Sequence, residues 1–551
     1  MKSDLLAARC GSILAVALLS ACGGTATNGF APPDTGGSSA SGGGSGDGNA
    51  SGGTGTSTGG VAGASSGGAA GASGASMSGA GGVATGGASG SAAGGASGTA
   101  GSGGVVGGAG AAGGAGAAGS AGSGGATTSC DNLPPEPTIP PACATLMAPK
   151  ATANGKPTDE STLDTTVIQS AIDACPSGQA VRLVTNGTST AFLSGPLMMK
   201  SGVALWIDTG VTLFGSRNPA DFDAKTAGAC GGNNTGASSC YAIINALKVT
   251  GASVMGAGTI DGRGGEVIAG STDTWWERET TYAGKLVAPR IVQTSGSQDF
   301  TLYGVHLQNS GKFHVVIDTT TGFTVWGISI VTSPTSPNTD GVDPSGSTNG
   351  VIAYNKISTG DDNIAIKGTG PVVDNLIIAH NHFGKGHGMS IGSETYGGVQ
   401  NVQVCDLSLD GTQNGLRIKS DVSRGGVVQN ITYTDVCMRN VRDPLVFDPY
   451  YSVATGTEIP DFHDIALHNV HILGAGANTL TGYDATHKLG ISLDNVIFDS
   501  VGTAMFTTSD ANVTLGPGPV NFKLTGTDVT LTDNTSNTAT PRDCSNAWTT
   551  F

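Results

Sequence analysis

Four short polar clusters recur along one part of the chain, and together they carry the residue types that acid–base catalysis needs. The clusters are Asn338-Thr339-Asp340-Gly341, Gly360-Asp361-Asp362-Asn363, Gly386-His387-Gly388 and Arg417-Ile418-Lys419. Asp340 lies 21 residues before Asp361. Asp362 lies 25 residues before His387, which in turn lies 30 residues before Arg417. These intervals match the period of a repeat in the same region, so we expect one cluster on each of four consecutive repeats.

Three carboxylates and an imidazole on neighbouring repeats suit hydrolysis of a glycosidic bond with inversion. In that reaction one carboxylic acid protonates the leaving oxygen and a second carboxylate activates water, with roughly 6.5–9.5 Å between the carboxyl groups. Crowding of Asp340, Asp361 and Asp362 should raise the pKa of at least one of them, so that it stays protonated and can serve as the acid. These three residues and His387 are therefore the candidate catalytic groups.

The last cluster, Arg417-Ile418-Lys419, predicts a binding site for a negatively charged sugar. Side chains alternate along a strand, so both cations should face outward while Ile418 enters the core. A guanidinium and an ammonium group are well suited to hold a carboxylate. Lys367 and Lys385 are further candidates for the same local positive charge.

Three other interpretations of these clusters remain open. The Asp-rich clusters resemble polar turns whose side chains cap backbone amides. Asp340, Asp343, Asp361 and Asp362 could instead hold Ca²⁺, which takes oxygen ligands, in a β-helical pectate lyase that cleaves by β-elimination. A non-catalytic surface protein that binds carbohydrate is the third hypothesis.

The elements that must position the clusters are short strands. A unit of alternating apolar residues starts at Phe300, Phe323, Val351, Leu376, Val402, Ile431, Ile465 and Ile491. Successive units start 23 to 34 residues apart, which leaves no room for helices between the strands. We predict an all-β fold, a single-stranded right-handed parallel β-helix whose coils stack about 4.8 Å apart.

One helix is expected before the first of these strands. Residues 164–175 place apolar side chains at helical spacing. An open end of a β-helix is an edge that could pair with another chain, so we assign this segment to an amphipathic helix that caps the N-terminal end.

With all four clusters in order, the sequence resembles the polygalacturonase family, the pectin-hydrolysing glycosidases of glycoside hydrolase family 28. The resemblance extends over roughly residues 143–451, through segments such as DTTVIQSAIDAC, SPNTDGVDP and STGDDNIAIKG. It implies hydrolysis of α-1,4-galacturonosyl bonds in pectin, without a cofactor and without a metal site.

The resemblance also implies a role for each site residue. Asp361 would be the general acid, Asp340 and Asp362 would activate the water, and His387 would tune the acid. Substrate would be bound by Asn338, Arg417, Lys419 and Tyr451, with Tyr450 as the less favoured match for the tyrosine. Two departures from the family pattern, Gly311-Lys312 after Asn309-Ser310 and Asn363 after the Asp pair, leave endo or exo action open.

Composition divides the chain of 551 residues and 92 glycines into unequal parts. Residues 23–129 are rich in Gly, Ser and Ala and contain one aromatic residue, so we expect a disordered tether rather than a core. Residues 130–551 are expected to form the β-helix domain.

A net charge of −16 argues against nucleic acid as a partner. A pectic substrate would bind through local cations, and we expect a monomer.

The first 22 residues predict export. Lys2 and Arg9 precede a short apolar stretch that ends in Leu19-Ser20-Ala21-Cys22, which resembles a bacterial lipobox. We therefore expect a cell-surface or outer-membrane lipoprotein whose only membrane contact is a lipid on Cys22, with plain secretion as the alternative. Eight cysteines remain after the signal, which predicts disulfides; only Cys230 with Cys240 is expected as a particular pair.

Overall fold

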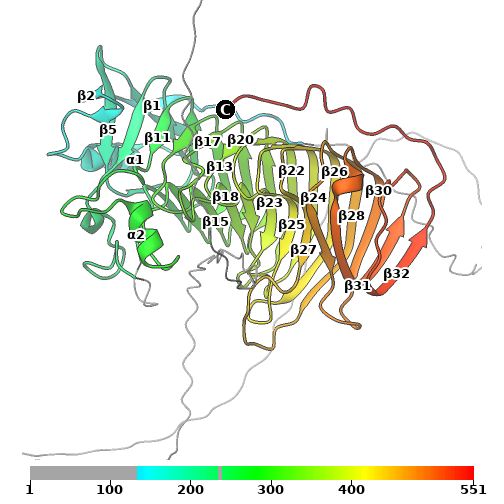
Figure 1. The fold of residues 1–551 in the computed structure, drawn as a ribbon. Coiled ribbons are helices and arrows are strands. Elements are labelled where there is room, and N and C mark those ends of the chain that lie inside the picture. Colours follow the sequence, from blue (N-terminus) through cyan, green and yellow to red (C-terminus); the bar gives the residue numbers. More distant parts are fainter. Residues whose placement is uncertain (1–132, 234–238) are drawn as a thin grey trace, which may run out of the picture. The chain divides into compact units, whose positions relative to one another are not determined.

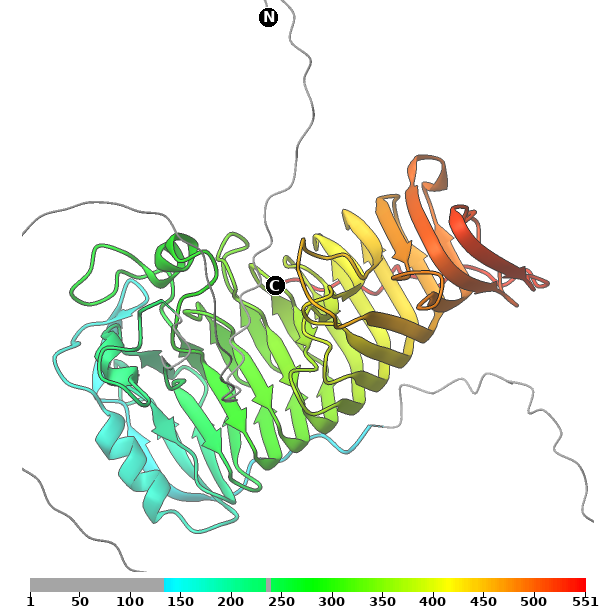
Figure 2. The ribbon, with the colours of Figure 1, turned by 90° about the horizontal axis from the view of Figure 1, so that it is seen from below.

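The computed structural model describes residues 133–233 and 239–551, and these residues form the predicted parallel β-helix. Figures 1 and 2 show the strands of successive coils lying side by side along the length of the solenoid. Nearly all strand pairs are parallel, and each strand pairs with its equivalents one coil before and one coil after. The period of the apolar repeat therefore gave the correct architecture.

The strands fall into three columns. The first column contains β6 (Leu197–Met198), β9 (Ile244–Leu247), β12 (Val292–Ser295), β15 (Val315–Asp318), β18 (Val342–Ser345), β21 (Ile364–Ile366), β23 (Met389–Gly392), β25 (Asn414–Lys419), β27 (Asp443–Asp448) and β29 (Ala477–Thr481). The second contains β1 (Ala142–Met147), β4 (Gln179–Val184), β7 (Val203–Ile207), β10 (Ser253–Gly256), β13 (Gln298–Tyr303), β16 (Thr321–Trp326) and β19 (Thr348–Ala353). The third contains β5 (Ser189–Ser194), β8 (Thr212–Gly215), β11 (Thr259–Asp261), β14 (His306–Gln308), β17 (Ser329–Val331) and β20 (Lys356–Ser358).

In the C-terminal half the second and third columns merge into long strands. These are β22 (Val373–Phe383), β24 (Val399–Asp410), β26 (Gly426–Arg439), β28 (Pro460–Ile472) and β30 (Leu489–Phe498), followed by β31 (Met505–Leu515) and β32 (Thr527–Asp533). At the other end, β2 (Lys150–Ala153) pairs antiparallel with both β5 and β3 (Lys156–Pro157). Two short 3-10 helices, Pro219–Phe222 and Val501–Thr503, complete the elements together with α1 and α2 described below.

The core is a set of apolar ladders inside the coils. In the first column one ladder is in register from coil to coil and fully buried; it consists of Ile244, Val292, Val315, Val342, Ile364, Met389, Leu416 and Leu445. Each coil can bury its apolar side chains only against its neighbours, so stacking supplies the hydrophobic stabilisation. Residues that alternate with this ladder point out of the first column and are available for chemistry.

The repeat unit that we placed at Val351 begins one residue earlier. Phe323 is in register with Gly350, and Gly350 with Leu376. A Cβ on Gly350 would lie 2.0 Å from the Phe323 ring, so the aromatic ring fills the space that the glycine leaves. Glycine does not count as apolar in the alternating pattern, which is why the sequence suggested the next residue.

A helix covers the N-terminal end of the solenoid as predicted. Helix α1 (Thr165–Ala174) buries Ile168 and Ile172 against the first coils. Cys175, directly after the helix, forms a disulfide with Cys143 in β1. A second short helix, α2 (Trp275–Thr281), begins with a capping box between Thr274 and Glu277 and lies within a longer insertion before β12.

The C-terminal segment, residues 534–551, runs back along the solenoid and ends beside its middle coils (Figures 1 and 2). A disulfide between Cys437 and Cys544 attaches it to β26, and Arg542 forms ion pairs with Asp406 and Asp435. The predicted disulfide between Cys230 and Cys240 is present as well.

Three predictions fall on residues that the structure does not describe: the signal peptide, the tether and the lipid on Cys22. The N-terminal boundary of the folded domain, placed at residue 130, also lies there. Among residues 133–233 and 239–551, none of the helices has the length and apolar character of a membrane span.

Candidate active site

The predicted site residues gather on the first column of strands. Asp340 lies two residues before β18, Asp361 and Asp362 lie just before β21, and His387 lies before β23. Backbone hydrogen bonds hold these turns in register, because the N–H of Gly341 donates to the carbonyl of Asp362 at 2.9 Å. The N–H of His387 donates to the carbonyl of Asp361 at the same distance, 2.9 Å. Four consecutive coils thus contribute to one site.

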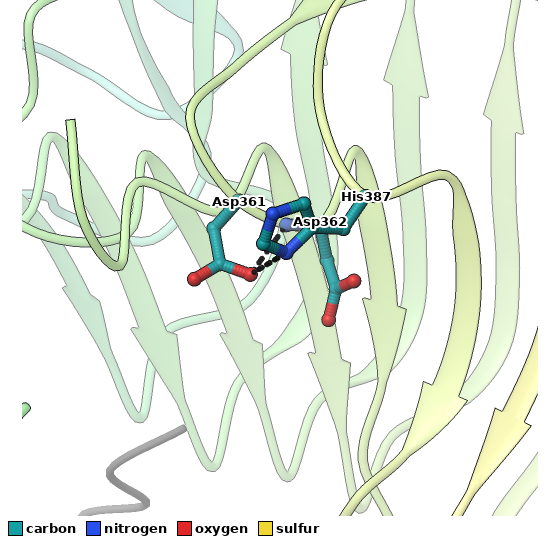
Figure 3. Close-up of side chains that lie close together, drawn as sticks. All are labelled: Asp361, Asp362 and His387. Carbon is teal, nitrogen blue, oxygen red and sulfur yellow. Dashed lines mark hydrogen bonds and ion pairs between the residues drawn. The ribbon is translucent and has the colours of Figure 1, made fainter. Parts of the chain in front are cut away.

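Asp361 and His387 form a close pair. Nδ1 of His387 lies 2.9 Å from Oδ1 of Asp361, and both side chains are partly exposed, at 16% and 19% respectively. Figure 3 shows the Asp361 carboxyl group facing the imidazole ring, while the Asp362 carboxylate extends away from that contact. Burial raises the pKa of Asp361, but the charge and hydrogen bond of His387 outweigh it and hold this pKa below its ordinary value. The pair can therefore hold one transferable proton at the surface of the site.

Asp362 is buried and bound by cations. Nζ of Lys419 donates to its Oδ2 at 2.9 Å, and the hydroxyl of Ser390 donates to its Oδ1 at 2.7 Å. A guanidinium nitrogen of Arg417 lies 3.6 Å from the same Oδ1. Burial alone would raise the pKa of Asp362, but the charge of Lys419 lowers it below the usual range, so this carboxylate stays ionised.

Asp340 is buried beside a second acidic group. Its Oδ2 lies 3.6 Å from Nζ of Lys367, while burial and the neighbouring carboxyl groups Asp343 and Asp361 raise its pKa well above the ordinary value. Asp343 is also buried, and within the described residues neither of its carboxyl oxygens has a hydrogen-bond partner. Burial raises the pKa of Asp343 to about 7. This side of the site therefore retains protons into the neutral range.

Crowding and burial raise the pKa of one of the three candidate aspartates, Asp340, as the sequence predicted. The role of Asp361 as general acid was implied by the family resemblance alone. In the structure the raised values belong to Asp340 and Asp343, because His387 compensates the charge of Asp361. The raised pKa values of Asp340 and Asp343 favour their protonated forms, whereas the lowered pKa of Asp361 favours its ionised form beside His387.

Arg417 and Lys419 lie above the ring of Tyr451. The guanidinium carbon of Arg417 is 5.3 Å from the ring centroid and Nζ of Lys419 is 5.0 Å from it. Tyr451 follows β27, one coil beyond the two cations. The neighbouring Tyr450 is exposed and stacks instead on Tyr483, with 5.4 Å between the ring centroids. The structure therefore brings Tyr451, the favoured match, into the site and leaves Tyr450 outside it.

Asn338 is placed in the site by a contact that the sequence did not reveal. Its side-chain amide is buried and donates to Oε1 of Glu279, a buried residue of α2. The same Glu279 forms an ion pair with Lys312 at 3.2 Å. Glu279 comes from an insertion 59 residues before Asn338, and no spacing signal connects the two.

The calcium alternative requires carboxylate oxygens that are free for a cation. Asp361, Asp362 and His387 do each bring one potential ligand atom within 4.8 Å of the others. However, Asp361 contacts His387, Asp362 binds Lys419, and Asp340 faces Lys367. Three of the four carboxyl groups proposed for Ca²⁺ thus already contact a basic side chain, and only Asp343 has both oxygens without a hydrogen-bond partner among the described residues, so the site offers Ca²⁺ few free oxygen ligands.

Comparisons with known proteins agree with this geometry. Residues 175–533 match the family Glycosyl hydrolases family 28. The chain belongs to this family. It is 45% identical over 488 residues to a polygalacturonase of Ralstonia nicotianae, covering 75% of this chain and 91% of that protein. It is 43% identical over 373 residues to an endo-polygalacturonase of Pectobacterium parmentieri, covering 67% of this chain and 89% of that one.

A solved structure of the family supports the same fold. The polygalacturonase from Erwinia carotovora ssp. carotovora superposes with a TM-score of 0.65 at 41% identity, covering 70% of this chain and all of that one. This family 28 protein is thus a glycoside hydrolase with a parallel β-helix fold. Its three described disulfides are consistent with export to an oxidising compartment.

Sequence reasoning missed or underrated three contacts of the site. Ser390 on β23 had no recognisable signal, and neither did Glu279. Lys367 was only a further candidate, although strand alternation places it outward after the buried Ile364 and Ile366. Lys385, named with it, is exposed and lies by Gly411.

Proposed function

We propose that this enzyme hydrolyses α-1,4-galacturonosyl bonds of polygalacturonate with inversion at the anomeric carbon. The observation that carries the proposal is that three carboxyl groups on adjacent coils each contact a different basic side chain. Asp361 contacts His387 and Asp362 contacts Lys419, each at 2.9 Å, while Asp340 faces Lys367 at 3.6 Å. The relatives that bear the name polygalacturonase support the same substrate.

Asp361 is the proposed acid because its carboxyl group is the most exposed of the three and contacts an imidazole. The C1–O4 bond of the substrate breaks as its leaving oxygen takes a proton through Asp361. His387, when protonated, replaces that proton across the 2.9 Å contact. The leaving sugar thereby departs as a neutral 4-hydroxyl rather than as an alkoxide.

Asp362 and Asp340 are the proposed groups that activate water. The water oxygen bonds to C1 from the opposite face, and its proton passes to the ionised Asp362, which Lys419 and Ser390 hold in place. Asp340 orients the same water, and solvent returns the accepted proton to the acid after the product leaves.

Arg417 and Lys419 are the proposed binding groups for a galacturonate carboxylate. Both cations lie above Tyr451, whose ring can also pack against an apolar face of a sugar. An anionic sugar bound there would lie next to the proposed reacting carboxyl groups. Asn338, whose side-chain amide donates to Glu279, is also proposed to support substrate binding.

The test is product analysis with unesterified polygalacturonate. Hydrolysis releases saturated reducing ends, survives EDTA, and gives a product whose new anomeric configuration is opposite to that of the bond, measurable by proton NMR. Asp361→Asn should lower kcat by several orders of magnitude while substrate binding is retained. Unsaturated, UV-absorbing products that disappear with EDTA would identify a lyase instead, and product lengths will separate endo from exo action.

We also propose that the folded domain is a monomer held at the cell surface by a lipid on Cys22, with residues 23–129 as a tether. The lipobox-like sequence Leu19-Ser20-Ala21-Cys22 supports this. Cys22→Ser should release the enzyme from the membrane fraction into the medium. Retention of that variant in the membrane would contradict the anchor, and light scattering of the released enzyme measures its oligomeric state.

A further inference from the structure

Lys367 has an unusual place in the site because it faces carboxyl groups without donating to any of them. Its Nζ lies 3.6 Å from Asp340 Oδ2 and 3.9 Å from Glu394 Oε2. Among the described residues no acceptor lies within hydrogen-bond distance of this ammonium, whereas Lys419 donates to Asp362 at 2.9 Å. Three N–H donors therefore remain available on a side chain that is 17% exposed.

The register places Lys367 and Lys419 in the same row of the first column. Gly392 pairs with Lys419, and Ile391 pairs with Ile366. Gly392 therefore lies beside Lys367 on one side and beside Lys419 on the other. The two lysines are thus two coils apart, roughly 9.6 Å by the strand spacing, with only a glycine between them. A Cβ at position 392 would lie 1.9 Å from the carbonyl oxygen of Lys419, so a side chain cannot be accommodated at this position between the two lysines.

Each lysine also has an aromatic ring beside it. Nζ of Lys367 lies 5.4 Å from the ring centroid of Phe313, where Arg290 approaches at the same distance of 5.4 Å. On the other side of the acidic residues, Lys419 and Arg417 lie above Tyr451. One set of cations thus surrounds Phe313 and a second set surrounds Tyr451. The three carboxyl groups lie between these two rings along the axis of the solenoid.

The charges near Lys367 leave it able to bind a further anion. The two nearest carboxyl groups, Asp340 and Glu394, lie 3.6 and 3.9 Å from its ammonium nitrogen, and Glu394 is shared with Arg424 at 3.5 Å. Lys419 donates one of its three N–H groups to Asp362 at 2.9 Å, which leaves two for a substrate carboxylate.

We infer that Lys367 binds the carboxylate of the galacturonate unit on the side of the cleaved bond opposite to the unit held by Arg417 and Lys419. This inference rests on the proposed function. It implies that the polysaccharide crosses the coils along the first column and that the enzyme requires free carboxylates on both sides of the bond. A methyl ester on either unit would remove one charge-assisted hydrogen bond.

The test compares Lys367→Met and Lys367→Arg with Lys523→Met, which removes an exposed lysine from the C-terminal part of the solenoid. For Lys367→Met we expect KM for polygalacturonate to rise about tenfold or more, and the preferred cleavage position in short oligogalacturonates to shift. Lys367→Arg should recover part of the loss, and Lys523→Met should behave as wild type. Circular dichroism and melting temperature confirm folding of each variant.

A binding measurement separates substrate contact from an effect on Asp340. In the Asp361→Asn background, titration calorimetry with trigalacturonate should show about tenfold weaker binding when Lys367→Met is added. If Lys367 serves only to balance Asp340, the substitution will alter the pH profile of kcat and leave KM, cleavage position and calorimetric affinity unchanged. That outcome overturns the inference while the wild-type enzyme still hydrolyses polygalacturonate; failure of the wild type to do so would instead refute the proposed function.

Discussion

The imidazole Nδ1 of His387 and the carboxyl Oδ1 of Asp361 lie 2.9 Å apart although the residues belong to different coils. This contact decides where the site holds a proton. Burial favours the neutral form of Asp361, and His387 is the largest of the influences that hold its pKa below the ordinary value. The imidazole therefore sets the pH range in which the pair can serve as an acid, and its removal is the first informative change.

His387→Gln should lower kcat about 10- to 100-fold and narrow the pH range of activity. Asp361 would then have to carry the acidic proton alone, and a carboxyl group loses its proton at a lower pH than an imidazolium does. We expect the alkaline limb of the kcat profile to move to lower pH than in wild type. His306→Gln, at an exposed position on β14, is the matched control. An unchanged alkaline limb would show that His387 does not supply the proton.

Tyr451→Ala should raise KM for polygalacturonate about three- to tenfold with a smaller effect on kcat, because the ring supports both Arg417 and Lys419. Tyr450→Ala removes an identical side chain from the adjacent position and should leave KM unchanged. Steady-state kinetics on both variants tests this difference. Equal effects of the two substitutions would argue against a binding role for Tyr451.

Asp343→Asn should stabilise the protein at neutral and alkaline pH. The folded-state pKa of Asp343 is about 7, above its ordinary value of 3.8, so the folded state binds a proton that the unfolded state has released. Wild-type stability therefore falls as pH rises from about 4 to 7, and no further loss from this group occurs above its folded pKa.

Asparagine cannot ionise and should abolish this contribution. We expect Asp343→Asn to melt a few degrees higher than wild type at pH 8 and to differ little at pH 4, as measured by calorimetry. A variant that melts lower than wild type at pH 8 would show that the charge of Asp343 is needed beside Lys367.

Cys544→Ser should destabilise the C-terminal segment by about 2–4 kcal/mol, because the Cys437–Cys544 disulfide closes a span of 107 residues. Thermal unfolding, together with limited proteolysis of residues 534–551, measures the loss. Wild type treated with a reductant should lose at least as much stability, because the Cys143–Cys175 and Cys230–Cys240 disulfides are reduced as well. Activity at low temperature should persist, since the disulfide attaches to β26 and the site lies on the first column. Undiminished melting temperature in both samples would mean that the other contacts of Arg542 suffice.

Sequence reasoning predicted the fold and most of the site because both depend on one period. When the coil length was known, Asp340, Asp361, His387 and Arg417 had to be near each other. The same reasoning failed wherever a contact departs from that period. Glu279 reaches Asn338 from an insertion before β12, and residues 534–551 return across several coils. The alignment of the repeats missed Gly350 because glycine does not count as an apolar residue, although the ring of Phe323 fills the space beside it.

The location of the proton could not be inferred from residue types alone. Three aspartates have the same ordinary pKa, and only their cation partners distinguish them. Lys419 and His387 lower the pKa values of Asp362 and Asp361, while Asp340 has a more distant lysine. The sequence indicated a crowded acidic site. The side-chain distances in the structure were needed to tell which aspartates have raised and which have lowered pKa values.

Each coil of the solenoid pairs only with its two neighbours, and this has a consequence for how such an enzyme can change in length. Coils added or lost outside the segment from α2 to Tyr451 would leave the contacts of the site described above intact. One coil inserted between Asp361 and His387 would separate them by a further 4.8 Å or so and abolish their contact. The ends of the molecule can therefore vary in evolution or by engineering, for example to extend the binding surface, while the number of central coils is fixed by the chemistry.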